Sequence, residues 1–447
     1  MFNDFPSETV TELQARGILE VADGNHGNDR PRPDEFGVGN TAFIRAADMD
    51  GGRVLFDSAE RINDIALVRI RKGKGKPGDI LFSSKGTVGK LALVQMNASP
   101  FVCSPQTTYW RTLDEKQLDR TFLYAFMQSS WFIEQWEAIK GDTDMAPYAS
   151  LTSQRQFRVP LPDIKFQRNV ASVFRPLDDK LELNRRMNRT LEGLAAALFR
   201  SWFVDFDPVV TKAAGRQPAH LRPELAALFP AHWQDSPLGP IPHGWRVGGI
   251  SDISTIASGG TPKTSVAEYW NGDIPWFSVV DTPATGQVFV LETEKTITQR
   301  GLDESSANLL PEGTTIITAR GTVGNLALVG MPMAMNQSCY AMIPKSGFSA
   351  AFVFFAMQNA VEDLQRMAHG SVFDTITRTT VDSLSLPIST PEILTAFDTI
   401  VSPWLAQIKH NVRESRTLAA LRDTLLPKLL SGELRVKPAK KLVEAHT

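Results

Sequence analysis

The chain has 447 residues, 42% of them hydrophobic and 21% charged, and its formal net charge at pH 7 is −2. This composition is typical of a soluble globular protein, no apolar run approaches the ~20 residues that span a bilayer, and the near-neutral charge argues against a free-standing nucleic-acid binder. The N-terminus has neither a basic flank nor an apolar stretch, so we expect no signal peptide and a cytoplasmic location. The two cysteines lie at unmatched positions and indicate neither a disulfide framework nor a cysteine metal site.

A first globular domain is predicted over residues 1–162. The β-rich runs FIRAA, DILFSS, KLALVQ and QTTYWRT predict its strands, and apolar residues at helical spacing predict a helix over 122–139. The segment 69–76, RIRKGKGK, holds five basic residues and no acid. It is either a solvated loop or a segment that contacts phosphate, and the sequence does not decide between these alternatives.

A first long helix is predicted over 163–206. Leucines at seven-residue spacing suit the packing of one helix on another, and an asparagine at such a position costs stability but fixes the register. The predicted coiled-coil positions here are Leu177, Leu181, Asn184, Leu191 and Leu198. The alternative for Asn184 is that it points to water. Pro176 lacks an N–H, so the helix is expected either to begin near it or to bend there. Counted from Pro176 to Phe203, the helix would be about 42 Å long.

Residues 207–244 are predicted to form a connector. Prolines recur along this segment and interrupt regular structure. One short helix is expected within it, at HLRPELAAL.

A second domain is predicted over 245–390, because part of the first domain recurs there. Residues 86–94 read GTVGKLALV and residues 321–329 read GTVGNLALV, so eight of nine positions agree. The odds of such a match by chance are on the order of 10⁻³. A repeat with a period of about half the chain predicts two copies of one domain rather than a solenoid. Further matched pairs are Asp48 with Asp281, Lys85 with Arg320, and Gln106 with Gln337. The segment PQTTY (105–109) likewise matches NQSCY (336–340).

A second long helix is predicted over 391–436, with a tail over 437–447. Pro403 and Asn411 of this helix match Pro176 and Asn184 of the first one. Its predicted coiled-coil positions are Asn411, Leu418 and Leu425. The repeated unit is therefore a globular domain followed by a long helix.

The shared loop partly fits the phosphate-cradling pattern G-x-x-x-x-G-K-[ST]. Ser84 stands at the first glycine position, Leu91 follows Lys90, and Asn325 replaces that lysine in the second copy. We therefore reject nucleotide binding. A glycine-rich turn between two strands, with glycines at positive φ, accounts better for the loop.

No catalytic or metal-binding pattern is found in the sequence. The histidines lack ligand spacing, and neither a G-x-S-x-G nor an H-E-x-x-H motif is present. The matched acids Asp48 and Asp281 are more typical of a turn or a helix cap than of a general base.

Polar side chains near the matched strands are interpreted as DNA-recognition groups. Gln, Asn, Arg and Lys pair bidentately with base edges, and a cation beside a glycine turn can contact a phosphate or a guanine. The scaffold matches between the copies while several of these polar positions differ, which suits two surfaces that read different sequences. The alternative for each residue is a solvated surface. The candidates are Asn25, His26, Arg45, Lys85, Thr87, Gln106 and Thr107 in the first copy, and Thr261, Lys263, Trp276, Ser278, Arg320, Thr322, Asn336 and Gln337 in the second.

The apolar ends of the two long helices are candidate docking surfaces for a partner protein. The alternative is that they pack against the domains of this chain. The residues concerned are Phe199, Trp202, Phe203, Leu426, Leu429 and Leu430.

The chain resembles the DNA specificity subunit of type I restriction-modification systems. The resemblance rests on GDILFSSKGTVGKLALV and its echo TTIITARGTVGNLALV, on NQSCY, SPLGPIPHGW and SGGTPKT, and on the helix tails NRRMNRTLEGLAAALFRSWFVDFDPV and SRTLAALRDTLLPKLLSGELRV. It implies an α+β fold with two similar target-recognition domains, mixed and mostly β with helices, separated by two long helices packed as an antiparallel coiled coil with a pseudo-two-fold axis. It also implies a chain that is not itself an enzyme and binds no metal or other cofactor.

The resemblance further implies the partners. These are double-stranded DNA, two methyltransferase subunits and restriction subunits, with S-adenosylmethionine, ATP and Mg²⁺ bound by the partner subunits. Two-fold proteins read paired half-sites about 34 Å apart, so we expect an asymmetric two-part site with an unread gap. The alternatives are a standalone DNA-modifying enzyme, either a nuclease or a methyltransferase, and a coiled-coil scaffold that binds only proteins.

Overall fold

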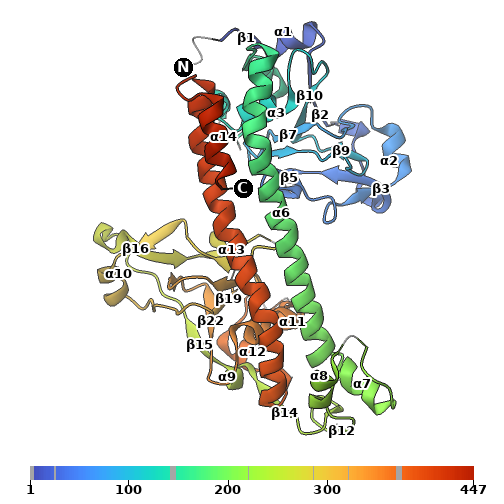
Figure 1. Cartoon of the computed structure of the whole chain (residues 1–447), viewed down its shortest axis with the longest axis vertical. Helices are drawn as coiled ribbons and strands as arrows, with labels where there is room; N and C mark the ends of the chain where they lie inside the picture. Colours follow the sequence, from blue (N-terminus) through green and yellow to red (C-terminus); the bar gives the residue numbers. More distant parts are fainter. Residues whose placement is uncertain are drawn as a thin grey trace. The chain divides into compact units, whose positions relative to one another are not determined.

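The computed structural model describes residues 5–24, 27–140, 147–219, 221–284, 286–320, 322–368 and 375–446. The chain divides into two compact units, of which one comprises residues 1–180 with 418–447 and the other residues 181–417. Each unit holds one sheet-containing domain and part of each of two long helices, α6 (Ile164–Phe203) and α13 (Pro391–Leu430), drawn in green and red in Figure 1.

The first domain contains several small sheets with helices around them. Its strands are β1 (Ser7–Thr9), β2 (Leu19–Asp23), β3 (Phe36–Ile44), β4 (Met49–Asp50), β5 (Arg53–Val54), β6 (Arg61–Ile62), β7 (Ile80–Ser83), β8 (Leu91–Leu93), β9 (Phe101–Cys103), β10 (Thr107–Thr112) and β11 (Arg158–Pro160). Four strands pair in the order β2-β10-β7-β8, three in the order β6-β3-β9, and β1 pairs with β11. Its helices are α1 (Val10–Ala15), α2 (Asp64–Arg69), α3 (Arg120–Met127), α4 (Ser130–Lys140) and α5 (Leu151–Gln154).

Among the described residues, the second domain repeats the three larger pairings of the first, without a counterpart of the β4-β5 pair. Its strands are β14 (Arg246–Gly249), β15 (Ser254–Ser258), β16 (Trp270–Phe277), β17 (Phe289–Val290), β18 (Lys295–Ile297), β19 (Thr315–Thr318), β20 (Leu326–Val329), β21 (Ala334–Met335), β22 (Cys339–Pro344) and β23 (Ser385–Ile388). The orders are β15-β22-β19-β20-β17, β18-β16-β21 and β14-β23, so only β17 lacks a counterpart in the matching sheet. Its helices are α9 (Ile250–Ile253), α10 (Gln299–Asp303), α11 (Ala350–Ala368) and α12 (Arg378–Asp382). The expectation of two copies of one α+β domain is confirmed.

The central strand β7 shows why the sequence forms these sheets. All four of its residues are buried, as are all four of β19. A strand that is covered on both faces tends to have consecutive apolar residues, as ILF has within DILFSS. One cover is helix α4, whose Phe132 ring packs edge-on against Phe82, with the two centroids 5.6 Å apart.

The helix expected over 122–139 is two helices. Helix α3 ends at Met127, and α4 begins at Ser130. Between them, both the backbone N–H and the hydroxyl of Ser129 donate to the Phe126 carbonyl, at 2.9 and 2.6 Å. A serine side chain that competes for backbone partners favours such an interruption. In the second domain, the corresponding α11 runs unbroken from Ala350 to Ala368.

The two long helices have matching bounds. Each has 40 residues, and the first residue of α13, Pro391, lies 227 positions after the first residue of α6, Ile164. Asn184 and Asn411 are separated by the same 227 positions. At 1.5 Å per residue each helix is about 60 Å long, which exceeds the expected 42 Å. The helix predicted over 163–206 is observed as α6, and Pro176 lies inside it, so of the two alternatives the start near that proline is excluded. The Asp163 carboxylate, which accepts from the Phe166 N–H at 3.0 Å, caps the earlier start.

The second helix is shorter than expected at its C-terminal end. Helix α13 ends at Leu430, not at 436, and a turn leads into a further helix, α14 (Val436–Glu444). Most of the expected tail is therefore helical. Gly432, with φ at 75°, supplies the left-handed residue that typically ends a helix.

Within residues 181–417, α6 and α13 run antiparallel around a buried polar network (Figure 1). Asn184 and Asn411 are each 1% exposed. The Asn184 amide donates to Glu414 at 2.8 Å and to Ser415 at 3.2 Å, and the Asn411 amide donates to Asn188 at 2.8 Å. The alternative that the asparagines point to water is wrong. The buried NH₂ groups of both asparagines find acceptors on the opposite helix in this register, and a shifted register would leave them unpaired.

The leucine positions vary in burial. Leu177, Leu418 and Leu425 are fully or almost fully buried in the first unit, while Leu181 is half-buried. Leu191 and Leu198 are partly buried and pack against the core of the second unit.

The connector contains more regular structure than expected. It holds the predicted short helix as α8 (Pro223–Leu228), and also α7 (Asp207–Ala213) and the pair β12 (Trp233–Gln234) with β13 (Ile241–Pro242). The Lys212 ammonium donates to the carbonyls of Ala226 and Phe229, and so joins α7 to the C-terminal end of α8. Among the described residues, no helix has both the length and the apolar character needed to cross a membrane.

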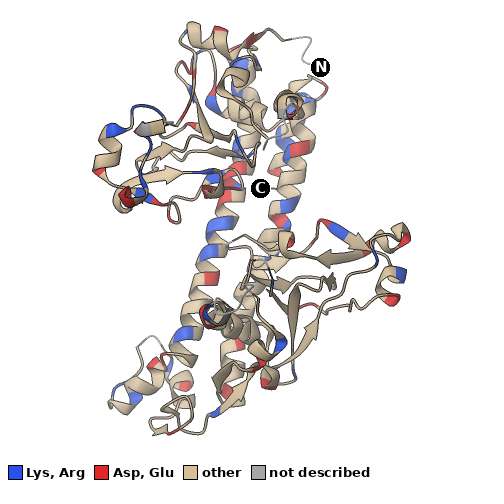
Figure 2. Ribbon diagram, turned by 180° about the vertical axis from the view of Figure 1, so that it is seen from behind, with Lys and Arg blue, Asp and Glu red and all other residues tan. Residues whose placement is uncertain are grey.

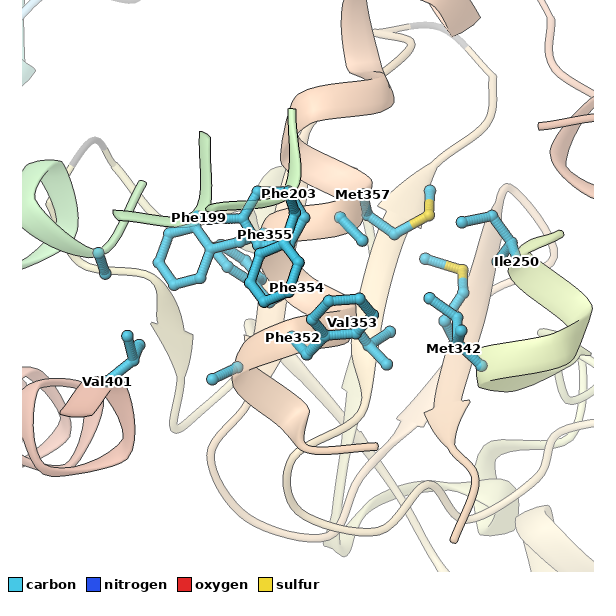
Figure 3. Packing of buried hydrophobic residues seen from close by; sticks show 14 of the residues in the cluster. Phe199, Phe203, Ile250, Met342, Phe352, Val353, Phe354, Phe355, Met357 and Val401 are labelled. Atoms are coloured by element: carbon cyan, nitrogen blue, oxygen red, sulfur yellow. The ribbon is translucent and has the colours of Figure 1, made fainter. Parts of the chain in front are cut away.

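The aromatic end of α6 belongs to the core of the second unit. Phe199, Trp202 and Phe203 are at most 4% exposed and lie in the same cluster as the α11 residues Phe352 and Phe355. Figure 3 shows Phe199 and Phe203 directed toward the aromatic side chains of α11. Their assignment to partner docking was therefore wrong, because a buried side chain presents no surface to a partner. The same correction applies to Leu426, Leu429 and Leu430, each at most 2% exposed in the first unit.

Replacing Phe203 with alanine should destabilise the isolated chain. The ring centroid lies 5.1 Å from that of Phe352 and 5.2 Å from that of Phe397, so Phe203→Ala opens a cavity. We expect a loss of about 3–5 kcal/mol in the free energy of unfolding, measured by urea denaturation of the chain without partners.

The control is Arg200→Ala, one turn away, whose side chain is 70% exposed. It should change the unfolding free energy by less than about 1 kcal/mol. If Phe203→Ala does not fold, Phe203→Leu supplies a smaller cavity and an intermediate loss. A wild-type midpoint for either Phe203 variant would restore the docking interpretation.

Candidate nucleic-acid interface

In the first domain, the strand ends meet along one edge. Strands β3 and β9 are parallel, so their carboxyl ends lie together, and the Ser104 N–H donates to the Ile44 carbonyl at 2.8 Å. The end of β7 joins them, because the Ser84 N–H donates to the Gln106 carbonyl at 2.8 Å. We call this edge, residues 23–24, 27, 44–46, 83–90 and 103–107, the strand-end edge of the first domain.

The edge is closely packed at Gly24. A methyl group on Gly24 would stand 2.1 Å from the Cys103 carbonyl oxygen, and one on Gly73 would stand 2.6 Å from the Gly24 Cα. Three chain segments therefore approach each other as bare backbone, which only glycine permits. Gly73 belongs to the basic segment 69–76, so this contact places that segment beside the strand-end edge.

The second domain has the same edge, formed by residues 258–263, 277–278, 318–320, 322–325 and 335–339. The Asn336 N–H donates to the Phe277 carbonyl at 2.8 Å, and the Ala319 N–H donates to the Ser338 carbonyl at 2.8 Å. Gly259 takes the place of Gly24, since a methyl group there would stand 1.8 Å from the Asn336 carbonyl oxygen.

The repeated GTVG segment is a turn at this edge. Gly86 and Gly89 have φ values of 76° and 104°, and Gly324 has 94°, as the glycine-turn interpretation predicted; Gly321 lies outside the described residues. The two glycines of the first copy differ in their surroundings. A methyl on Gly86 would meet nothing within 4 Å, whereas one on Gly89 would stand 2.6 Å from the Trp136 ring.

The two lysines around this turn have different environments. Lys85 is exposed, and its ammonium lies 5.4 Å from the centroid of the Tyr148 ring, a cation–π contact. Lys90 instead donates to the carbonyls of Ala46 and Met49, both at 3.1 Å. Lys90, which stands at the phosphate-binding position of the rejected nucleotide motif, therefore holds two segments of the domain together. Lys85, in contrast, presents its charge at the turn.

A pocket of about 560 Å³ opens beside the strand-end edge of the first domain. Three arginines, two phenylalanines and a glutamine contribute to its lining, namely Arg30, Arg32, Arg45, Phe36, Phe43 and Gln106. A concave surface with several cations and an amide suits an anionic, hydrogen-bonding ligand such as nucleic acid.

A buried ion pair supports this pocket. The Arg69 guanidinium donates to the Glu35 carboxylate and, at 3.3 Å, to the Arg30 carbonyl. The hydrogen bond from Arg69 holds the pKa of Glu35 below its ordinary value. Arg69, the first residue of the basic segment, is therefore structural, while Arg71, Lys72, Lys74 and Lys76 are exposed.

Charge along the long helices is mixed. Figure 2 shows Lys and Arg alternating with Asp and Glu on both helices. Since the net charge of the chain is −2, a surface that attracts nucleic acid has to be local. The pocket and the basic segment supply such a surface in the first domain.

Most predicted contact residues of the first domain reach its strand-end edge. Arg45, Lys85, Thr87 and Gln106 are exposed there, whereas Asn25 and His26 lie outside the described residues. The prediction was wrong for Thr107. Its side chain is fully buried, and its hydroxyl bonds with that of Ser104 at 3.1 Å, so it cannot contact a ligand.

In the second domain, the predicted residues divide into exposed and structural ones. Trp276 is 7% exposed and its indole N–H donates to the Gly260 carbonyl at 2.9 Å, so its assignment as a contact was wrong. Ser278 is half-buried, and its hydroxyl donates to Asp281 at 2.9 Å. The Thr261 hydroxyl donates to Gln337. The exposed members of the set are Lys263, Arg320, Thr322 and Gln337, with Thr261 and Asn336 half-buried.

Several site residues were missed from the sequence. The pocket cations Arg30 and Arg32 belong to the run Arg30-Pro31-Arg32-Pro33, whose alternating arginines and prolines were a readable signal. Tyr148, which supports Lys85, had no such signal, because its contact depends on a chain segment about sixty residues away.

The matched acids cap short turns. The Arg45 N–H donates to Asp48 and the Ser278 N–H donates to Asp281, both at 2.7 Å, as the cap interpretation expected. Within the described ranges, no three His, Cys, Asp or Glu side chains are grouped so that they could hold a metal ion. Cys103 and Cys339 are buried, and burial raises the pKa of each thiol, so neither is a reactive nucleophile.

The fold defines a protein with two copies of one α+β domain, each followed by a long helix, and comparison with known proteins identifies its family. The family model described as type I restriction modification DNA specificity domain matches residues 12–193 and 242–402. The type I restriction enzyme HindI specificity subunit of Haemophilus influenzae is 27% identical over 439 residues, covering 88% of this chain and 94% of that protein. The MjaIX specificity subunit of Methanocaldococcus jannaschii is 29% identical over 188 residues, 42% of this chain and 44% of that one.

A solved structure has the same fold. The S subunit of a type I restriction-modification system from M. genitalium superposes with a TM-score of 0.51 and 15% identity, over 96% of both chains. At this identity the likeness supports the fold alone.

The chain belongs to the family of type I restriction-modification DNA specificity subunits. The expectation that it is the specificity component of such a system, and not itself the enzyme, is confirmed by these matches.

Alanine at the second turn glycine should cost more stability than alanine at the first. Both Gly86→Ala and Gly89→Ala place a Cβ at positive φ, which costs about 1–2 kcal/mol. Gly89→Ala also drives its methyl against Trp136, which adds about 1–3 kcal/mol of overpacking. Urea midpoints of the two variants measure the difference, and equal losses would contradict this account of the turn.

Proposed function

We propose that this chain reads an asymmetric, two-part DNA site, with one half-site read by the strand-end edge of each domain. The observation that carries this proposal is that one topology occurs twice while the polar groups on its edge differ. Arg45 in the first domain stands where the second has Ser278, and Lys90 stands where it has Asn325. Because base preference depends on the side chains that reach the base edges, two equal scaffolds with different edge residues should prefer different bases in the two half-sites.

The proposal includes a gap between the half-sites and an approximate two-fold relation of the domains. Two-fold proteins bind half-sites about one helical turn apart. Helices of about 60 Å are long enough to separate two DNA-reading domains by at least one helical turn of DNA.

We also propose that the chain assembles with two methyltransferase subunits and with restriction subunits. S-adenosylmethionine, ATP and Mg²⁺ would be bound by those partners. The burial of the helix ends leaves the partner-docking surface unassigned. A cytoplasmic location stays a prediction.

Replacing Lys85 with alanine should weaken DNA binding equally for all sequences. Its ammonium is exposed at the turn and is supported by Tyr148, a placement that suits a phosphate contact. For Lys85→Ala in the complex with methyltransferase subunits, we expect the slope of log K against log salt to fall by about 1. The control is Lys116→Ala, an exposed lysine beyond Thr112, the end of β10 that lies away from the edge. Unchanged affinity of Lys85→Ala at moderate salt would remove Lys85 from the interface.

Exchange of one domain should change one half-site. Replacing residues 245–390 with the second domain of another specificity subunit should alter one half of the selected sequence and leave the other half and the gap unchanged. Selection from a randomised duplex library by the assembled complex measures this. A change in both halves would refute the independence of the domains, and recovery of one contiguous motif by the wild type would refute the two-part site.

Two further results would favour the alternative functions. Methylation of DNA by the purified chain alone would favour a standalone enzyme, and no DNA affinity in the full assembly would favour a protein scaffold.

A further inference from the structure

Arg45 is held in one orientation by three neighbouring groups. It directly follows β3, and its guanidinium carbon lies 5.3 Å from the ring centroids of both Phe36 and Phe43. The two rings meet edge to face, with centroids 5.3 Å apart. The guanidinium also forms an ion pair with Glu60. An arginine stacked on aromatic rings and paired at one edge loses little rotamer freedom when it binds a planar partner.

The guanidinium remains available to a ligand. The Arg45 side chain is 44% exposed, and it lines the 560 Å³ pocket together with Gln106, Arg30 and Arg32. Arg30 and Arg32 are exposed cations on the same pocket, so phosphate contacts do not require Arg45. Arg45 and Gln106 are both residue types that form bidentate contacts with bases, to guanine and adenine respectively.

Glu60 distinguishes a base from a phosphate as the partner of Arg45. Its carboxylate is 53% exposed and lies next to the guanidinium, so a phosphate bound there would meet a like charge. A G·C pair is neutral. In the major groove its guanine offers the O6 and N7 acceptors to an arginine, and its cytosine offers an N4 amino donor to a carboxylate. The Arg45–Glu60 pair therefore matches the edge of a G·C pair and opposes a phosphate.

We propose that Arg45 reads a guanine in the half-site bound by the first domain, and that Glu60 is a positioning residue for it. This inference rests on the proposed function and deepens it. The assignment is specific to the first domain. The N–H groups of Arg45 and Ser278 make the same 2.7 Å bond to Asp48 and Asp281, so the two residues occupy equivalent positions, and the second domain has no guanidinium there.

The test is selection from a randomised duplex library by the complex of full-length chain and methyltransferase subunits. The wild-type first half-site should contain an invariant G·C pair. Arg45→Lys keeps the charge but loses the planar fork, so discrimination at that one pair should fall by about 5- to 150-fold. The other positions, the second half-site and the salt slope should stay as in the wild type. Arg45→Ala should lose the same discrimination.

Two control variants separate a base contact from a general electrostatic one. Arg32→Ala removes a pocket cation and should weaken binding to all sequences by one factor, with a smaller salt slope. Glu60→Gln removes the neighbouring negative charge, so it should strengthen binding to an unrelated duplex while lowering discrimination at the G·C pair. A merely structural role of Glu60 would change neither quantity.

Three outcomes would overturn the assignment: a wild-type first half-site without a G·C pair, an unchanged selected site for Arg45→Lys, or an equal loss of affinity for every sequence with both Arg45 variants. These differ from failure of the proposed function, which would appear as a wild-type complex that selects no gapped two-part site. Urea midpoints of the Arg45 variants, expected to match the wild type because the side chain is half-exposed, show that the variants are folded.

Discussion

The parallel pairing of β3 with β9, repeated as β16 with β21, is the constraint on which the rest of the site depends. Most strand pairs in these domains are antiparallel, and antiparallel neighbours bring opposite ends together. A parallel pair instead delivers two carboxyl ends to one place. The Gly24 and Gly259 contacts then press a third segment against them. Residues about eighty positions apart in sequence thereby share one edge, on a framework of backbone contacts that depends on glycine at Gly24, Gly73 and Gly259.

This separation between framework and edge explains how two domains can keep one fold and differ in surface. The turn glycines, the capping acids Asp48 and Asp281, and the fully buried strands β7 and β19 are the same in kind in both copies. The exposed positions around them, Arg45 and Ser278 above all, are different. Stability and recognition therefore reside in different atoms, so a change in the recognised sequence need not cost stability.

The sequence predicted the duplication, the four strands β3, β7, β8 and β10 of the first domain and most of the edge, because each of these depends on local pattern or on comparison of the two copies. It failed where the outcome depended on distant partners. Phe203 is apolar at a helix end, and only the packing of Phe352 and Phe397 shows that it is core rather than a docking surface. Thr107 and Trp276 can form hydrogen bonds and lie in matched strands, but each stands in a stretch of strand that is buried on both faces, so neither reaches a ligand. Pro176 left open whether the helix starts or bends there, and the cap at Asp163 shows that the helix begins before the proline and runs through it.

The polar network between α6 and α13 shows what divergence after duplication does to pairing. Asn184 opposite Ser415 and Asn411 opposite Asn188 are equivalent contacts, since both residues of each pair lie 227 positions from their counterparts. Two copies of α6 in the same register would set Asn184 against Asn188, and two copies of α13 would set Asn411 against Ser415 beside a second Glu414. A pair of α6 helices would lack the Glu414 and Ser415 acceptors, with Met187 and Asn188 at those positions, whereas a pair of α13 helices would keep equivalent acceptors but bring two Glu414 carboxylates into the network. The hydrogen-bond network therefore favours the pairing of α6 with α13 over the pairing of two identical helices. It directs the two helices of one chain to each other rather than to a neighbouring molecule.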